Sequence, residues 1–117
     1  IVILGILAAT ALPKFVDLSG EAHEATANAV LGAANSAAAM NYAAVLVGGK
    51  DAAGNTATAI TADATGATKL LTFLDVPFEW TAGTSLISAA LGSKTYTITI
   101  TTAETASGKA VLTLTSS

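Results

Sequence analysis

The chain has 117 residues, which is enough for one domain and too few for two domains of ordinary size. It has five lysines, no arginine and a net charge of -3, so we do not expect nucleic-acid binding as a main role. It also has no cysteine, which excludes disulfides and thiolate metal sites, and 27 alanines, which leave few large side chains for a core.

The first predicted element is an apolar helix over residues 1–12, in which Thr10 is the only polar residue. As a helix this segment would span roughly 18 Å, against about 30 Å for the hydrocarbon core of a bilayer. Because it is apolar on all sides, it must be surrounded by lipid or by protein. Pro13 ends the segment, since its ring clashes with the carbonyl of Ala9 and removes one helical hydrogen bond.

Helical spacing continues after Pro13 to about residue 47. One apolar stripe repeats every three or four residues, and its members are Phe15, Leu18, Ala22, Ala25, Ala29, Ala33, Ala37, Met40 and Ala44. The acidic and amide side chains of this segment fall largely on other faces. Gly48 and Gly49 predict the end of the helix.

A loop and a short helix are predicted next. Residues 48–62 are typical of a loop, in which Thr56–Thr61 is a candidate short strand. Asp63 can cap the helix that follows. The apolar residues on one face of that helix are Ala67, Leu70, Leu71 and Leu74, and Pro77 closes it.

The last forty residues favour strands. Alternation places Val76, Phe78, Trp80 and Ala82 on one side. The stretch "SLISAAL" is ambiguous. The clearest strand is "KTYTITITTA", with Tyr96, Ile98 and Ile100 on one face, and "KAVLTLT" pairs with it in a hairpin across Glu104–Gly108.

These elements predict an α+β fold in which a long N-terminal α-helix packs against a small C-terminal antiparallel β-sheet. The helix covers residues 1–47, with an apolar assembly or membrane half at 1–13 and an amphipathic half at 14–47. A connecting segment with the short helix covers 48–75, and the sheet covers 76–117. We expect Phe73, Phe78 and Trp80 to hold the sheet against the helix.

The sequence contains no constellation of residues that predicts catalysis. His23 lies in "EAHEATA", which lacks the second histidine of a zinc protease motif because position 27 is alanine. We therefore expect His23, with the neighbouring Asp17, Glu21 and Glu24, on an exposed helix face and not in a metal site. We predict no enzyme and no cofactor.

Two places in the chain carry acidic side chains that could be compared with a calcium site. Residues 50–56, "KDAAGNT", offer few oxygen donors, and the acids near the predicted sheet are only Asp75, Glu79 and Glu104. Calcium needs several oxygen ligands that converge on one point. We therefore predict no metal site.

The opening "GILAATALPKF" resembles the N-terminal helix of type IV pilins and the related pseudopilins. In that family the mature chain starts with a methylated aromatic residue or Met. The resemblance implies that about nine residues, including a helix-borne glutamate, precede Ile1, and these would bring the apolar segment to membrane-spanning length. Many pilins close a C-terminal loop with a disulfide, which this chain cannot form.

The resemblance implies a structural subunit of a type IV pilus that self-assembles through its hydrophobic helix and supports adhesion, motility or DNA uptake. Its partners would be identical subunits in a helical filament and the inner-membrane assembly machinery. The subunit would lie in the inner membrane before assembly and in an extracellular filament at the cell surface afterwards. The alternatives are a pseudopilin of a type II secretion system and a membrane-anchored module that binds a ligand with its threonine-rich sheet.

The predicted assembly interface lies at the start of the helix. Its residues are Ile1, Ile3, Leu4, Gly5, Leu7, Ala8, Ala9, Leu12, Pro13, Phe15 and Leu18. Gly5 and Ala9 are four residues apart and permit close approach of helices. We also expect Gly5–Pro13 to be partly unwound in the assembled filament, as the resemblance suggests.

Overall fold

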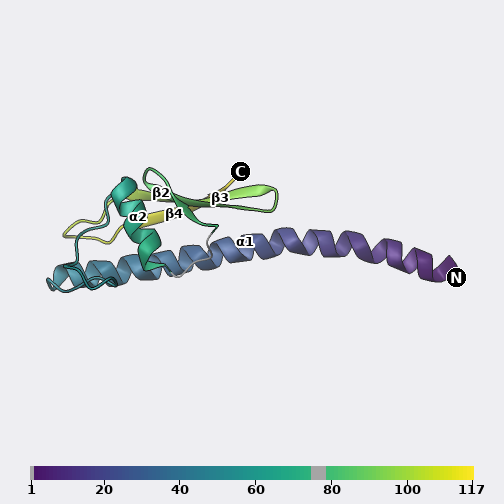
Figure 1. Ribbon diagram of the computed structural model, residues 1–117, viewed down its shortest axis with the longest axis horizontal. Helices are drawn as coiled ribbons and strands as arrows, with labels where there is room; N and C mark the ends of the chain where they lie inside the picture. The colour runs from purple at the N-terminus through teal and green to yellow at the C-terminus, as the bar shows by residue number, and fades with distance from the viewer. Residues whose placement is uncertain (1, 75–78) are drawn as a thin grey trace.

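The computed structural model describes residues 2–74 and 79–117, with side chains from Gly20 onward within these ranges. Its elements are α1 (Val2–Leu46), α2 (Ala64–Phe73), β1 (Thr81–Ala82), β2 (Leu86–Leu91), β3 (Lys94–Thr102) and β4 (Val111–Ser116). The molecule is elongated, with extents of 71 × 22 × 22 Å. Figure 1 shows the sheet and α2 stacked on the C-terminal half of α1. The predicted α+β arrangement is confirmed.

The end of α1 follows the predicted glycine signal. The helix ends at Leu46, and Gly48 adopts a positive φ of 64°. The backbone N–H groups of Gly48 and Gly49 donate to the carbonyls of Val45 and Ala44, at 3.2 and 2.8 Å. A glycine in the left-handed region lets the chain turn back and satisfy the last helical carbonyls, which is why the helix stops here.

The candidate strand at Thr56–Thr61 is wrong. This part of the chain has only an isolated bridge between Lys50 and Thr56, and residues 57–61 have no regular structure. Its backbone is held by scattered partners, because the carbonyl of Ile60 accepts from the N–H of Glu104 and the N–H of Ala57 donates to Gly49. No neighbouring strand is therefore available to extend the bridge into a ladder.

The predicted helix α2 and its cap are confirmed. The Asp63 side chain accepts from the N–H of Gly66 at 3.0 Å, and Thr61 Oγ1 donates to the same carboxylate oxygen at 2.6 Å. Ala67, Leu70 and Leu74 are buried on one face of this helix. The helix ends at Phe73, ahead of Pro77, which lies outside the described residues.

The Asp63 cap makes the stability of the fold depend on pH in the acidic range. The hydrogen bond from Thr61 and the N–H of Gly66 hold the pKa of Asp63 below its ordinary value. A lowered folded-state pKa means that the carboxylate stabilises the fold above the ordinary aspartate pKa of about 4, and that this effect is lost as the pH falls from there toward the lower pKa of the folded state. We expect Asp63→Asn, which keeps an acceptor oxygen, to remove part of the acid destabilisation. Urea unfolding curves at neutral and acidic pH measure this, and identical pH profiles for both proteins would contradict it.

The four strands form one antiparallel sheet in the order β1-β2-β3-β4. The ambiguous stretch 85–91 contains β2, which pairs with β3 through Ile87 and Ile98. Tyr96, Ile98 and Ile100 are buried on one face of β3, as predicted. At the other edge, Trp80 is buried but Ala82 is exposed. The predicted alternation fails there because β1 has only two residues and Trp80 precedes it; Val76 and Phe78 lie outside the described residues.

The hairpin of β3 and β4 has the predicted partners but a longer connection. β3 ends at Thr102 and β4 begins at Val111, with a register shift between Ile100 and Thr102. Inside the connection, Thr105 and Gly108 form an isolated bridge that closes a tight turn. The loop therefore reaches beyond the predicted Glu104–Gly108, because Glu104 turns away from the ladder and donates its N–H to Ile60.

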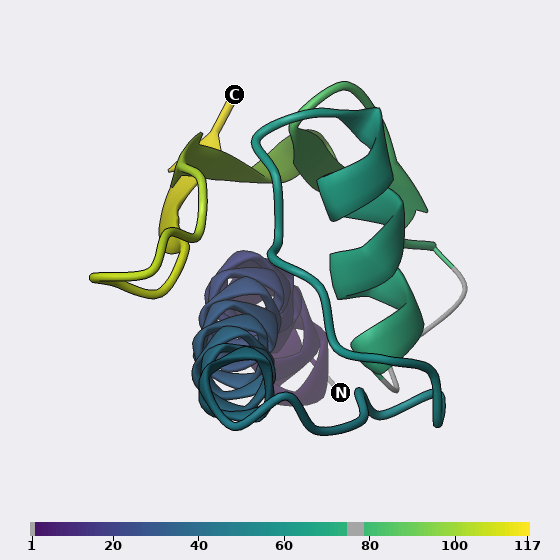
Figure 2. The same cartoon turned by 90° about the vertical axis from the view of Figure 1, so that its left-hand side faces the viewer.

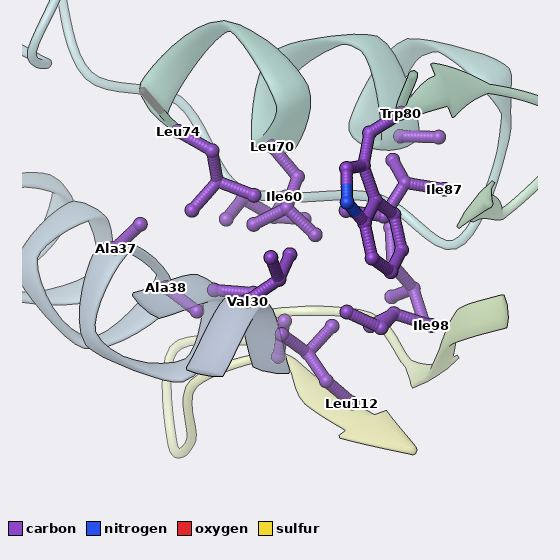
Figure 3. Packing of buried hydrophobic residues seen from close by; sticks show 14 of the residues in the cluster. Val30, Ala37, Ala38, Ile60, Leu70, Leu74, Trp80, Ile87, Ile98 and Leu112 are labelled. Atoms are coloured by element: carbon purple, nitrogen blue, oxygen red, sulfur yellow. The ribbon is translucent and has the colours of Figure 1, made fainter. Parts of the chain in front are cut away.

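One hydrophobic core joins α1, α2 and the sheet. Its fully buried large side chains are Ile60, Leu70, Ile87 and Ile98. Figure 3 shows them around Trp80, with Val30 and Ala38 of α1 and Leu112 of β4 closing the cluster. Phe73 is half-buried against this core, and the predicted contribution of Phe78 lies outside the described residues.

Candidate assembly surface

The predicted assembly residues lie in the first part of α1, which extends past the sheet and α2 (Figure 1). Ile1 and the side chains of the others lie outside the described part. Those whose backbone is described as helical are Ile3, Leu4, Gly5, Leu7, Ala8, Ala9, Leu12, Pro13, Phe15 and Leu18. The helix runs through Pro13 in this single subunit. Unwinding of Gly5–Pro13 in a filament stays a prediction.

The second half of α1 buries one face and leaves another open. The buried residues of its core face are Ala27, Val30, Ala34, Ala37, Ala38 and Asn41. The exposed residues on the outer face are Glu21, Ala22, Ala25, Ala29, Gly32, Ala33, Ser36, Ala39, Met40 and Ala43. Both sets repeat every three or four residues, so each follows one side of the helix. Figure 2, which looks along α1, shows the sheet and α2 on one side of the helix and its opposite side uncovered.

The apolar stripe predicted from the sequence is mostly this open face. Of its members, Ala22, Ala25, Ala29, Ala33 and Met40 are exposed, whereas Ala37 is buried. The fold uses the other side because the larger side chains Val30 and Leu31 lie there, and they fill more of the space beneath the sheet. Alanine occurs on both sides, so its spacing alone does not tell the covered face from the open one.

The open face is uncharged from Ala25 to Ala43, with the exposed Glu21 one turn before Ala25. Residues 25–49 contain no charged side chain. At the C-terminal end of α1, Met40, Leu46 and Val47 are 66%, 56% and 81% exposed. In the described part of the chain, Gly20–Leu46 is long and apolar enough to cross a membrane, by length and composition only. Only one side of this helix is buried in the core, so its remaining apolar side chains are exposed on the open face.

His23 is placed differently from the prediction. It is half-buried, and its ring lies against Gly92 in the turn between β2 and β3. Gly92 has a φ of 66°, and a Cβ added there would lie 2.8 Å from His23 Cε1. The contact needs a glycine both for the backbone conformation and for the space. Among the described residues, no three histidine or acidic side chains gather around it or elsewhere.

A buried polar contact ties α1 to the β3–β4 connection. Asn41 Nδ2 donates to Glu104 Oε1 and Oε2 at 3.2 and 3.1 Å, and to the carbonyl of Thr58 at 3.0 Å. Asn41 and Glu104 are only 4% and 6% exposed. Lys69 Nζ donates to the same Thr58 carbonyl and to Thr58 Oγ1, the latter at 2.8 Å. One loop carbonyl therefore links α1, α2 and, through Asn41, the sheet.

Sequence reasoning missed this contact, because the sequence does not show which face of α1 is covered. Asn41 continues the spacing of the buried positions Ala34, Ala37 and Ala38, which placed an amide on the core face. In the sequence, Glu104 stands out only as one of three acidic residues near the predicted sheet that could be compared with a calcium site. Of the other two acids in that hypothesis, Glu79 is exposed and Asp75 lies outside the described residues. At the other place compared with a calcium site, Asp51 Oδ1 accepts hydrogen bonds from the backbone N–H groups of Ala53 and Asn55, at 3.0 Å each.

An open groove of about 630 Å³ lies between the 51–58 loop and α2. Its lining residues include Asp51, Asn55, Thr65, Lys69 and Phe73. Lys69 Nζ lies 5.6 Å from the centroid of the Phe73 ring, so the cation covers part of the aromatic surface. This groove is on the helical side of the fold. The threonine-rich sheet face, which the binding-module alternative invokes, does not line it.

No family model matches the chain, and neither the curated proteins nor the solved structures include a significant match.

Proposed function

We propose that this chain is the major structural subunit of a type IV pilus. The observation that carries the proposal is the uncharged open face of α1, which is distinct from the face that builds the core. The same spacing of three and four residues connects Ala22 to Leu18, Phe15, Ala11 and Leu7 in the part of α1 that extends past the sheet. Lys14 and Glu21 interrupt this spacing with charges, whereas from Ala25 to Ala43 the open face is uncharged and lies uncovered in the single subunit, as expected of a surface that a second subunit covers.

In this proposal the subunit waits in the inner membrane with the first half of α1 in lipid. The assembly machinery then extracts it and stacks copies with their helices inside and their sheets outside. Each helix exchanges lipid for neighbouring helices, so the net gain comes from close packing of small side chains and not from hydrophobic burial alone. The alanines of the open face suit this role because they let helix backbones approach closely. Adhesion, motility or DNA uptake would follow from the filament.

The test is a charge placed on the open face. Ala29→Asp introduces a carboxylate at an exposed position, so the subunit still folds, but a helix–helix contact would bury the charge without a partner. We expect loss of filaments from the cell surface by electron microscopy, with normal subunit levels in the membrane. Thr84→Asp is the control, because Thr84 is exposed near the β1 edge of the sheet and away from α1. Normal filaments in the Ala29→Asp strain would contradict the proposal.

A further inference from the structure

The strand β4 forms a free edge of the sheet. It is last in the order β1-β2-β3-β4, and β1 at the other edge has only two residues. β4 has six residues, with no charged side chain and no proline. Edge strands of natural proteins are commonly protected by charge, proline or shortness, because their unpaired groups can bind another strand. β1 has the last of these protections, whereas β4 has none of the three.

The hydrogen-bond pattern identifies which groups of β4 are free. Thr95 and Ser117 exchange both backbone hydrogen bonds, at 2.9 and 3.0 Å. Bonded and non-bonded pairs alternate along an antiparallel ladder, so the N–H and C=O groups of Leu112, Leu114 and Ser116 point away from β3. Among the described residues, no hydrogen bond reaches these outward groups.

A groove lies beside this edge on the core side of the sheet. It has a volume of about 460 Å³ and opens between β4 and the part of α1 that carries Glu24, Asn28 and Leu31. Leu114 and Ser116 of β4 also line it. A strand added next to β4 would point every second side chain toward this groove, since alternate residues of a strand face the same side.

We propose that β4 pairs antiparallel with β4 of a second copy of this chain, about a two-fold axis at Leu114. In this register Leu112 lies opposite the partner's Ser116, and Thr113 lies opposite the partner's Thr115. The free groups of one edge then meet the free groups of the other, and the exposed threonines form cross-strand pairs, which are favourable. Leu114 of the added strand falls over the groove beside Leu31.

Charge complementarity favours a second copy as the occupant. Lys109 is exposed just before β4, and an antiparallel partner places its Lys109 beyond Ser116. At that end α1 carries the exposed Glu21 and Glu24 and β3 begins with the exposed Lys94, so the partner's Lys109 meets two carboxylates and one lysine, a net opposite charge. No like charges face each other within the paired strands, because β4 has none. This contact is separate from the helix contacts of the proposed filament.

Cysteine pairing tests the register directly, because the natural chain has no cysteine. Full-length Thr113→Cys and Thr115→Cys chains would be mixed in mild detergent and oxidised. We expect the mixed disulfide between positions 113 and 115 to exceed both homodisulfides and the share that random pairing gives. A random distribution of the three products would overturn the proposal. The detergent-solubilised subunit is used, so the result does not depend on filament formation.

A second experiment measures association without new covalent bonds. The double variant Thr113→Lys, Thr115→Lys places like charges opposite each other across the two-fold axis, and both positions are exposed. We expect the wild-type chain to sediment as a dimer in density-matched detergent and this double variant to sediment as a monomer. The control is Thr81→Lys, Thr84→Lys near the opposite edge, which should leave the dimer unchanged. A wild-type chain that stays monomeric at all concentrations, or a Thr113→Lys, Thr115→Lys dimer of unchanged stability, would overturn the proposal.

Discussion

Replacing Asn41 with alanine is expected to lower the free energy of unfolding by about 3 kcal/mol, because it leaves a buried carboxylate without its donor. Asn41 Nδ2 contacts both oxygens of Glu104, and both residues are almost fully buried. The substitution would also remove the hydrogen bond that Asn41 of α1 donates to the carbonyl of Thr58. Urea unfolding of the two proteins in the same mild detergent measures the difference.

Asn28→Ala on the same helix is the matched control for this prediction. Asn28 is exposed, and its Nδ2 donates only to the carbonyl of Glu24 four residues earlier. We expect a change within about 0.5 kcal/mol, since surface substitutions away from special contacts have small effects. Adding Glu104→Ala to the Asn41→Ala chain should restore part of the stability, because the stranded charge is then removed. Equal effects of Asn41→Ala and Asn28→Ala would show that the contact is not stabilising.

The elements with a strong local signal could be predicted from the sequence. β3 alternates threonine with Tyr96, Ile98 and Ile100, and this period of two needs no tertiary information to be read. α2 has both a capping aspartate and an apolar face with helical spacing. The candidate strand at Thr56–Thr61 failed because its threonines and Ile60 have strand propensity, whereas a strand also needs a neighbour to pair with. In the fold that segment is held by Asn41, Lys69 and Glu104, which are distant in sequence.

The covered face of α1 could not be predicted because alanine makes both of its sides suitable for packing. Ala29 and Ala34 both lie in alanine-rich parts of the helix beside an asparagine, yet Ala29 is exposed and Ala34 is fully buried. Which face of α1 is buried depends on the side that packs against the sheet, and therefore on Val30, Leu31 and the residues of β4 that they contact. Likewise, nothing near Glu104 in the sequence indicates Asn41, because the two are brought together only when the β3–β4 connection folds back onto α1. The open face is thus a property of the fold and not of the local pattern.

Replacing Gly66 with alanine is expected to destabilise the fold by about 3 kcal/mol, at the upper end of the usual cost of overpacking. A Cβ added at Gly66 would lie 1.8 Å from the carbonyl oxygen of Thr61 and 2.7 Å from its carbonyl carbon. These are backbone atoms, so the clash cannot be relieved by rotating a side chain. Thr61 follows Ile60, whose side chain is fully buried and whose carbonyl binds Glu104, so moving it disturbs both the core and the β3–β4 connection.

Gly32→Ala on α1 provides the opposite expectation with the same chemical change. Gly32 is exposed in the helix interior, and an added Cβ would meet no atom within 4 Å. We expect this substitution to stabilise the subunit by about 0.5–1 kcal/mol, because alanine loses less backbone entropy than glycine on forming a helix. Urea unfolding of the two variants beside the natural chain measures both effects. If Gly66→Ala were as stable as Gly32→Ala, the close approach of α2 to the backbone of Thr61 would have to be abandoned, and with it the tight turn by which Asp63 caps the helix.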